Sequence, residues 1–201
     1  NLPNYEHEIL FIDNCSTDKT REILRQLAKE DVHVKCIFNA KNFGWTRSSY
    51  YGIINTTGDC SILLAADMQE PPEKIIEFIA EWEKGTKIVI GIKNKSKENK
   101  IKYFLRNCYY NFISRIAETE HIKQFMGFGL YDKEFVNVLR DLNDPLPYLR
   151  GIVAELGFSR KEIKYTQEKR MEGKTHFSFF KAYDLAMLGI TSSSKILMRL
   201  A

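Results

Sequence analysis

The sequence predicts an α/β protein with an open, mostly parallel sheet and flanking helices. Three observations lead to this fold class. Short apolar runs alternate with segments of helical periodicity through the first half of the chain. Carboxylate, hydroxyl, proline and glycine residues stand where these segments begin and end. The chain has 201 residues, of which 44% are hydrophobic, and is therefore long enough to bury a core.

The first strand and helix are predicted between residues 8 and 30. Residues 8–13 form an apolar run that ends in a carboxylate, and the oxygens of Ser16, Thr17 and Asp18 can cap the following helix. The apolar stripe of that helix consists of Ile23, Leu24, Leu27 and Ala28. A second strand is predicted over 32–38 and a second helix over 47–55.

A third strand is predicted over 61–65 and a fourth over 88–92. Pro71, Pro72 and Glu73 begin the helix between them, since proline is tolerated in a first helical turn, and Gly85 ends it. This alternation of strands and helices is typical of parallel strands with helical crossovers. Residues 126–130 carry two glycines and predict a strand or a turn.

Composition excludes several classes of function. The net charge is +4, from 30 basic and 26 acidic residues, and no basic-aromatic motif is present, so we expect no nucleic-acid partner. The four cysteines lack the close spacing of a zinc site. The sequence contains no run of 18 apolar residues, which is the length that a membrane-spanning helix needs.

The chain begins at Asn1 and stops at Ala201 within a helical pattern. We therefore interpret the sequence as part of a longer protein.

Two predicted strands deliver an acid to the edge of the sheet where ligands bind in open α/β folds. Asp13, with Asn14, follows the first strand and can hydrogen-bond a base or ribose. Asp67, with Gln69, follows the third and can offer oxygen ligands to Mg²⁺ or Mn²⁺. Each acid alone is better explained as a helix cap. Two acids at the same edge of one sheet favour a site.

Five segments in this order resemble family 2 glycosyltransferases: FIDNCSTDKT, NFGWTRSSYYGIINTTGD, AADMQEPPE, RGIVAELGF and RMEGKTHF. They are most similar to the branch that moves sugars onto polyisoprenyl phosphates. The resemblance implies a GT-A fold, a UDP- or GDP-linked sugar donor and a divalent cation. It implies that Asp13, Asn14 and Asn42 contact the nucleotide. It also implies that Asp67 and Gln69 lie at the metal and diphosphate.

The chain departs from the family pattern in three places. The opening strand, with its loop over the nucleotide, is absent. Asn14 and Cys15 replace the second acid and the glycine of the usual Asp-Asp-Gly-Ser run. Ala65 replaces the first acid of the Asp-X-Asp metal motif, and one carboxylate fewer weakens the expected binding of Mg²⁺ or Mn²⁺. A natural variant that relies on Asp67 and a degenerate site both remain open.

Positive charge gathers near the end of the chain. Residues 160–201 have a net charge of +5, whereas residues 1–159 have −1. We therefore divide the chain into a catalytic domain, 1–159, and a basic acceptor-side segment with an amphipathic juxtamembrane helix, 160–201. The hydrogen-bond donors expected to bind phosphate are Arg106, Arg170, Lys174, Thr175 and His176. The alternative is a solvated basic surface, or a packed histidine at position 176.

The resemblance implies inverting transfer of a sugar to an undecaprenyl-type phosphate for cell-envelope polysaccharide, with Asp67 and Arg170 as catalytic residues. The expected location is the cytoplasmic face of the cell membrane, and a homo-oligomer is left open. A phosphate acceptor needs no general base, and the sequence shows no separate candidate for one. Two alternatives stand beside this reading: a transferase that acts on a saccharide hydroxyl, and an inactive nucleotide-sugar-binding subunit. We expect little or no transferase activity from residues 1–201 alone.

Overall fold

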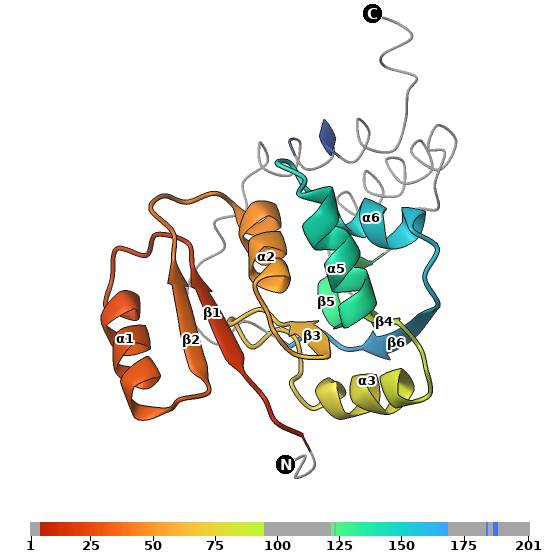
Figure 1. Ribbon diagram of the computed structural model, residues 1–201, viewed down its shortest axis with the longest axis horizontal. Coiled ribbons are helices and arrows are strands. Elements are labelled where there is room, and N and C mark those ends of the chain that lie inside the picture. Colours follow the sequence, from red (N-terminus) through yellow and green to blue (C-terminus); the bar gives the residue numbers. More distant parts are fainter. Residues whose placement is uncertain (1–4, 95–121, 123, 169–183, 185–186, 189–201) are drawn as a thin grey trace, which may run out of the picture. The chain divides into compact units, whose positions relative to one another are not determined.

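The computed structural model describes residues 5–94, 122, 124–168, 184, 187 and 188, which divide into two compact units (Figure 1). Unit 1 comprises Asn1–Ser61 and Tyr131–Pro147, and unit 2 comprises Ile62–Leu130 and Tyr148–Ala201. Strands β3 (Cys60–Leu63) and β5 (Phe125–Asp132) contain the boundaries between them. Each unit is described by itself.

Unit 1 is built on two parallel strands, β1 (Ile9–Asp13) and β2 (Val34–Phe38). Helix α1 (Thr20–Glu30) connects them and packs against β2, while α2 (Trp45–Ile54) packs against β1 (Figure 1). In the register of the pair Asp13 lies opposite Phe38, so both strands end at the same level. The loops that follow them, which carry Asn14 and Asn39, therefore meet.

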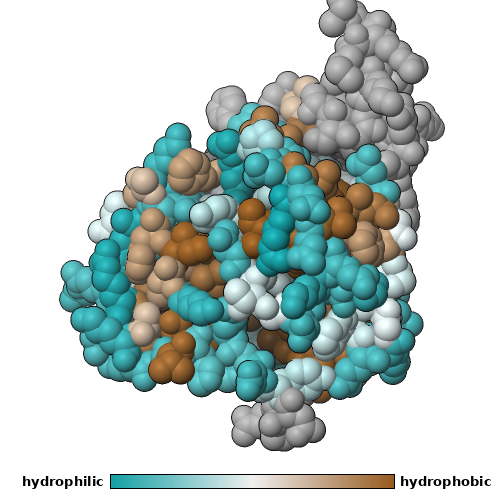
Figure 2. Space-filling model, viewed as in Figure 1, coloured by the Kyte–Doolittle hydropathy of each residue, from teal (hydrophilic) through white to brown (hydrophobic). Residues whose placement is uncertain are grey.

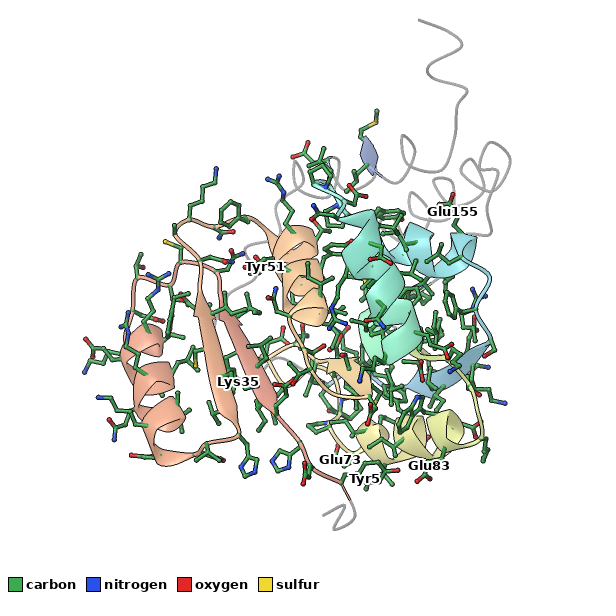
Figure 3. The ribbon with its side chains drawn as sticks, viewed as in Figure 1. Tyr5, Lys35, Tyr51, Glu73, Glu83 and Glu155 are labelled. Carbon is green, nitrogen blue, oxygen red and sulfur yellow. The ribbon has the colours of Figure 1, made fainter. Side chains whose placement is uncertain are left out.

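Helix α5 (Lys133–Leu142) completes unit 1. The sequence did not predict it, although Asp132 caps its first turn by accepting a hydrogen bond from the Glu134 backbone at 2.9 Å. The Tyr50 hydroxyl, on α2, donates to the Leu139 carbonyl of this helix. On β2, Lys35 (labelled in Figure 3) pairs with Glu8 at 2.6 Å and secures the start of β1.

Unit 2 contains parallel strands β4 (Ile88–Lys93) and β6 (Arg160–Tyr165), with helices α3 (Lys74–Glu83) and α6 (Leu149–Glu155). The Phe128 ring lies at the centre of its core, 4.8 Å from Phe78 and 5.2 Å from Tyr165. Residues 126–130 belong to β5, so the strand was the correct alternative. A Cβ at Gly129 would lie 2.7 Å from the Val89 carbonyl oxygen, so glycine here permits close approach of two backbones.

The described strands form two sheets where the sequence predicted one. The sheet of β1 and β2 has two strands, and the other has four in the order β3-β5-β4-β6. Asp13 ends β1 and Asp67 follows β3, so the prediction that both acids lie at the edge of one sheet was wrong. Among the described strands, β1 is hydrogen-bonded only to β2, and consecutive strands in the sequence are not all neighbours.

Smaller differences concern where elements begin and end. Helix α3 begins at Lys74, after both prolines, and the carbonyls of Pro71 and Pro72 accept the first backbone hydrogen bonds of the turn. Strand β3 ends at Leu63, two residues before the predicted end. The face drawn in Figure 2 is mostly hydrophilic with separate hydrophobic patches, as is usual for a folded domain.

Candidate functional site

Asp13 ends β1 with a carboxylate that is almost completely buried, at 4% exposure. Both of its oxygens lie 3.2 Å from the Ser16 backbone nitrogen, and Oδ2 accepts a hydrogen bond from Arg21 Nε at 2.5 Å. Burial tends to raise the pKa of Asp13, but hydrogen bonds from Ser16 and Arg21 outweigh it and hold the pKa below its ordinary value. Asp13 is therefore an ionised anchor of the loop between β1 and α1.

Asn14 is the centre of a polar network above β1 and β2. Its side-chain oxygen accepts three hydrogen bonds, from Asn39 Nδ2 at 3.2 Å, the Phe43 backbone at 2.9 Å and Ser48 Oγ at 3.0 Å. Its amide nitrogen donates to Asn42 Oδ1 at 2.9 Å, which also accepts from the Gly44 backbone at 2.9 Å. An asparagine suits this position because it accepts and donates at once, which an aspartate cannot do. The structure thus brings the predicted residues Asn14 and Asn42 together.

The sequence did not predict a role for Arg21. Its guanidinium joins the Asp13 carboxylate to the Asn39 carbonyl, which lies 2.5 Å from one terminal nitrogen of Arg21. One signal was available, because Arg21 lies in the first turn of α1, where the helix dipole disfavours a cation. A cation in that position indicates a nearby anion.

Asp67 lies in a tight loop of unit 2 between β3 and α3. Its carboxylate accepts a hydrogen bond from the Gln69 backbone at 3.2 Å, and the intervening Met68 has a left-handed φ of 57°. Gln69 is joined to Glu168 by two bonds: Glu168 N donates to the Gln69 carbonyl at 3.1 Å, and Gln69 Nε2 lies 3.4 Å from the Glu168 carbonyl. The loop therefore holds Asp67 and Gln69 in one compact turn that is tied to the residues after β6.

Glu70 closes this loop and was also missed. Its side chain is buried, at 6% exposure, and Oε2 accepts a hydrogen bond from the Ala65 backbone at 2.8 Å. Burial raises the pKa of Glu70 to about 7, against the opposing effect of the Ala65 hydrogen bond and with a further rise from the negative charge of Asp67. A carboxyl group is thus present beside position 65 although residue 65 itself has none.

The donor set in this loop fits a divalent cation only together with substrate oxygens. In the part of the chain that the structure describes, no three His, Cys, Asp or Glu side chains are grouped to hold a metal. Asp67 supplies a carboxylate and Gln69 an amide. Mg²⁺ commonly takes one or two protein carboxylates and completes its octahedron with water and phosphate oxygens. The residues present are compatible with that arrangement.

Several predicted site residues lie outside the described part of the chain. They are Arg106, Arg170, Lys174, Thr175 and His176, together with most of the predicted juxtamembrane helix. Their roles, and the division of the chain at residue 159, remain predictions. No helix within the described ranges is long and apolar enough to cross a membrane.

Comparison with known proteins finds a family model and relatives that match most of the chain. The model of glycosyl transferase family 2 matches residues 1–140. The uncharacterized glycosyltransferase YkcC of Bacillus subtilis is 30% identical over 196 residues, which are 97% of this chain and 61% of that protein. The bactoprenol glucosyl transferase of Shigella phage SfX is 30% identical over 200 residues, 98% of this chain and 65% of that protein. The chain thus spans less than two thirds of these relatives.

Solved structures share the fold, among them the following two. Glucosyl-3-phosphoglycerate synthase from Mycobacterium tuberculosis, in complex with phosphoglyceric acid, has a TM-score of 0.56 at 11% identity and covers 92% of this chain and 69% of its own. Mannosyltransferase PcManGT from Pyrobaculum calidifontis, in complex with GDP-Man and Mn²⁺, has a TM-score of 0.51 at 14% identity, with coverages of 94% and 62%. These likenesses confirm the predicted α/β fold of the GT-A type.

Proposed function

Because the chain belongs to glycosyl transferase family 2, as the sequence motifs predicted, we propose that the protein transfers a sugar from a nucleotide sugar to a polyisoprenyl phosphate. The observation that carries the acceptor is the likeness to bactoprenol glucosyl transferases, which extends over 98% of the chain for the phage SfX protein. The donor is proposed to be UDP- or GDP-linked.

Each of the two site loops, taken by itself, offers groups of the kind that bind part of a nucleotide sugar. In unit 1, the amides of Asn14 and Asn42 offer hydrogen-bonding groups of the kind that bind a base or ribose, and Asp13 fixes the loop beneath them. In unit 2, Asp67 and Gln69 offer oxygen ligands of the kind that hold a cation at a diphosphate. We propose that Asn14 and Asn42 contact the nucleoside and that Asp67 and Gln69 hold the cation.

The proposed reaction is a single displacement at the anomeric carbon. An oxygen of the acceptor phosphate forms a bond to that carbon while the bond to the nucleotide diphosphate breaks on the opposite face, which inverts the configuration. The acceptor carries about −1.5 to −2 charges near neutral pH, by analogy with other phosphomonoesters, and needs no general base. Mg²⁺ or Mn²⁺ bound at Asp67 would neutralise charge on the departing diphosphate.

The remaining contacts are proposed from the sequence. Arg170, with Lys174, Thr175 and His176, is assigned to donor or acceptor phosphate, and Arg106 to a second anionic contact. A polyisoprenyl acceptor requires that the protein act at a membrane surface, so we retain the predicted cytoplasmic face of the cell membrane. A homo-oligomer remains open.

The test is transfer of labelled sugar by the full-length protein in membranes. Glucose and related sugars linked to UDP, and mannose linked to GDP, are each supplied with undecaprenyl phosphate and Mn²⁺. We expect a labelled lipid from one donor. We also expect a loss of at least tenfold in Asp67→Asn, since changes even at residues that only support a metal ligand commonly cost about 10- to 100-fold. Glu73→Gln, a change at an exposed side chain, is the matched control. Transfer only to a saccharide hydroxyl would refute the proposed acceptor.

Ala65 favours a second candidate, a nucleotide-sugar-binding subunit without activity. The two are separated by calorimetry with UDP and GDP, with and without Mn²⁺. The enzyme is supported if Mn²⁺ strengthens nucleotide binding by the wild type but does not strengthen binding by Asp67→Ala. Binding that is indifferent to metal, combined with no transfer, supports the inactive subunit.

A further inference from the structure

We propose that Arg21 is a positioning residue of the nucleotide site, which holds the ends of β1 and β2 together so that Asn14 and Asn42 face a ligand as one unit. The inference rests on the proposed function, because it assigns Asn14 and Asn42 to the donor nucleotide. Arg21 itself contacts Asp13 and the Asn39 carbonyl and is not proposed to touch the nucleotide.

The contacts of Arg21 reach both strand ends. Nε lies 2.5 Å from Asp13 Oδ2 at the end of β1, and a terminal nitrogen lies 2.5 Å from the Asn39 carbonyl just after β2. The Asp13 side chain is 1% exposed and that of Arg21 is 26% exposed, so the ion pair is largely shielded from water. Shielded, hydrogen-bonded ion pairs are costly to break, since one charge then remains buried without a partner.

A guanidinium is suited to this bridge because its nitrogens point in different fixed directions. A lysine ammonium could keep the ion pair with Asp13, but it lacks the rigid fork that also reaches Asn39. The position in the helix does not explain why residue 21 is an arginine, because a cation in the first turn of α1 opposes the helix dipole. The bridge does explain it.

Hydrogen bonds connect the Arg21 bridge to the side-chain amides of Asn14 and Asn42, which are proposed to face the ligand. Asn39, whose carbonyl Arg21 holds, donates from its side chain to Asn14 Oδ1 at 3.2 Å and to Ser48 Oγ at 3.1 Å. Asn14 in turn donates to Asn42 Oδ1 at 2.9 Å. Loss of the bridge would release Asn39 and, through it, the orientation of Asn14 and Asn42.

Arg25 provides a matched control. It lies one helical turn further along α1, is exposed, and its guanidinium sits 4.7 Å from the Phe38 ring, while that of Arg21 sits 5.7 Å from the same ring. Arg21→Met and Arg25→Met each remove one positive charge and one contact with Phe38. Only Arg21→Met removes the bridge between Asp13 and Asn39.

The experiment measures the dissociation constants of UDP and GDP by calorimetry, together with donor KM and kcat, in the full-length protein. We expect Arg21→Met to weaken nucleotide binding about tenfold, equivalent to about 1.4 kcal/mol, and to raise donor KM more than it lowers kcat. Arg25→Met should bind like the wild type. Arg21→Lys should recover part of the affinity, because it restores the charge opposite Asp13.

A pH profile separates positioning from a general loss of structure. Among the residues that the structure describes, Arg21 and the exposed Asp18 carry charges that act on Asp13. Without Arg21 the pKa of Asp13 should rise, so the acid limb of nucleotide binding should move to higher pH in Arg21→Met and stay in place in Arg25→Met. A purely structural defect would lower binding at every pH without moving that limb.

Equal affinities for Arg21→Met and wild type, or equal losses in Arg21→Met and Arg25→Met, would overturn the inference. If Arg21→Met does not fold, Arg21→Gln and Arg21→Lys take its place in the same comparison. A wild-type protein that binds neither UDP nor GDP refutes the proposed function itself. A wild type that binds, beside an Arg21 variant that binds equally well, refutes only the role of Arg21.

Discussion

Replacing Glu70 by glutamine is expected to change how the stability of the protein depends on pH. The Glu70 carboxyl is buried against the Ala65 backbone, and the negative charge of Asp67 acts on it. Its pKa is raised from an ordinary value of 4.5 to about 7 in the folded protein. Glutamine keeps an oxygen that can accept the Ala65 hydrogen bond but cannot ionise.

The sign follows from proton binding. Between pH 4.5 and pH 7 the folded protein holds more protons at Glu70 than the unfolded chain does, so stability falls as pH rises. The stabilisation by protonated Glu70 is fully present below its pKa in the unfolded chain, 4.5. It is lost as the pH rises through its pKa in the folded protein, about 7. A pKa difference of about 2.5 corresponds to about 3 kcal/mol at 1.36 kcal/mol for each pH unit. Relative to wild type, Glu70→Gln should therefore gain about 3 kcal/mol of unfolding free energy between pH 4 and pH 8.

The assay is urea unfolding of both proteins from pH 4 to pH 8 in the presence of EDTA, which removes any effect of metal on the neighbouring Asp67. Glu73→Gln is the control, because Glu73 (labelled in Figure 3) is exposed three residues away. The difference between Glu70→Gln and wild type should widen with pH, whereas the control should run parallel to wild type. Parallel curves for Glu70→Gln and wild type would contradict the raised pKa of Glu70.

Three further changes test backbone strain, close packing and a buried hydrogen bond by urea unfolding. Cys15 has a left-handed φ of 68°, so Cys15→Gly should stabilise the protein by about 1 kcal/mol, and a loss of stability would contradict the assigned strain. Gly129→Ala should destabilise by about 2 kcal/mol, because its Cβ would lie 2.7 Å from the Val89 carbonyl; an unchanged midpoint would count against that contact. Tyr50→Phe should cost about 1 kcal/mol for the buried hydrogen bond to Leu139, with Tyr51→Phe, at an exposed position, as the neutral comparison.

The sequence predicted the elements whose signals are local. Strands β1 to β4 and helices α1 to α3 were predicted because an apolar run or stripe lies between clear start and stop residues. Strand β6 was missed because its sequence, RKEIKY, alternates charged and apolar residues weakly, and its identity as a strand comes from pairing with β4. Sheet order was not predictable for the same reason, since strand pairing joins distant segments.

The candidate site was predictable in part. Asn14 and Asn42 were assigned to the same ligand, and they are hydrogen-bonded to each other. Arg21 and Glu70 were missed because their partners are defined by the folded loops: a backbone carbonyl of Asn39 for the one and a backbone amide of Ala65 for the other. A contact with the main chain cannot be predicted from residue types, and the one available signal was the unfavourable position of Arg21 in the first turn of α1.

The side-chain oxygen of Asn14 is approached by more donors than it can serve at full strength. An amide oxygen has two lone pairs, whereas Asn39, Phe43 and Ser48 all direct a hydrogen toward it. At any moment, therefore, only two of the three donors can form a full hydrogen bond with Asn14. Loss of the Ser48 hydroxyl would leave Asn14 satisfied by Asn39 and Phe43, so the orientation of the Asn14 side chain does not depend on this hydroxyl.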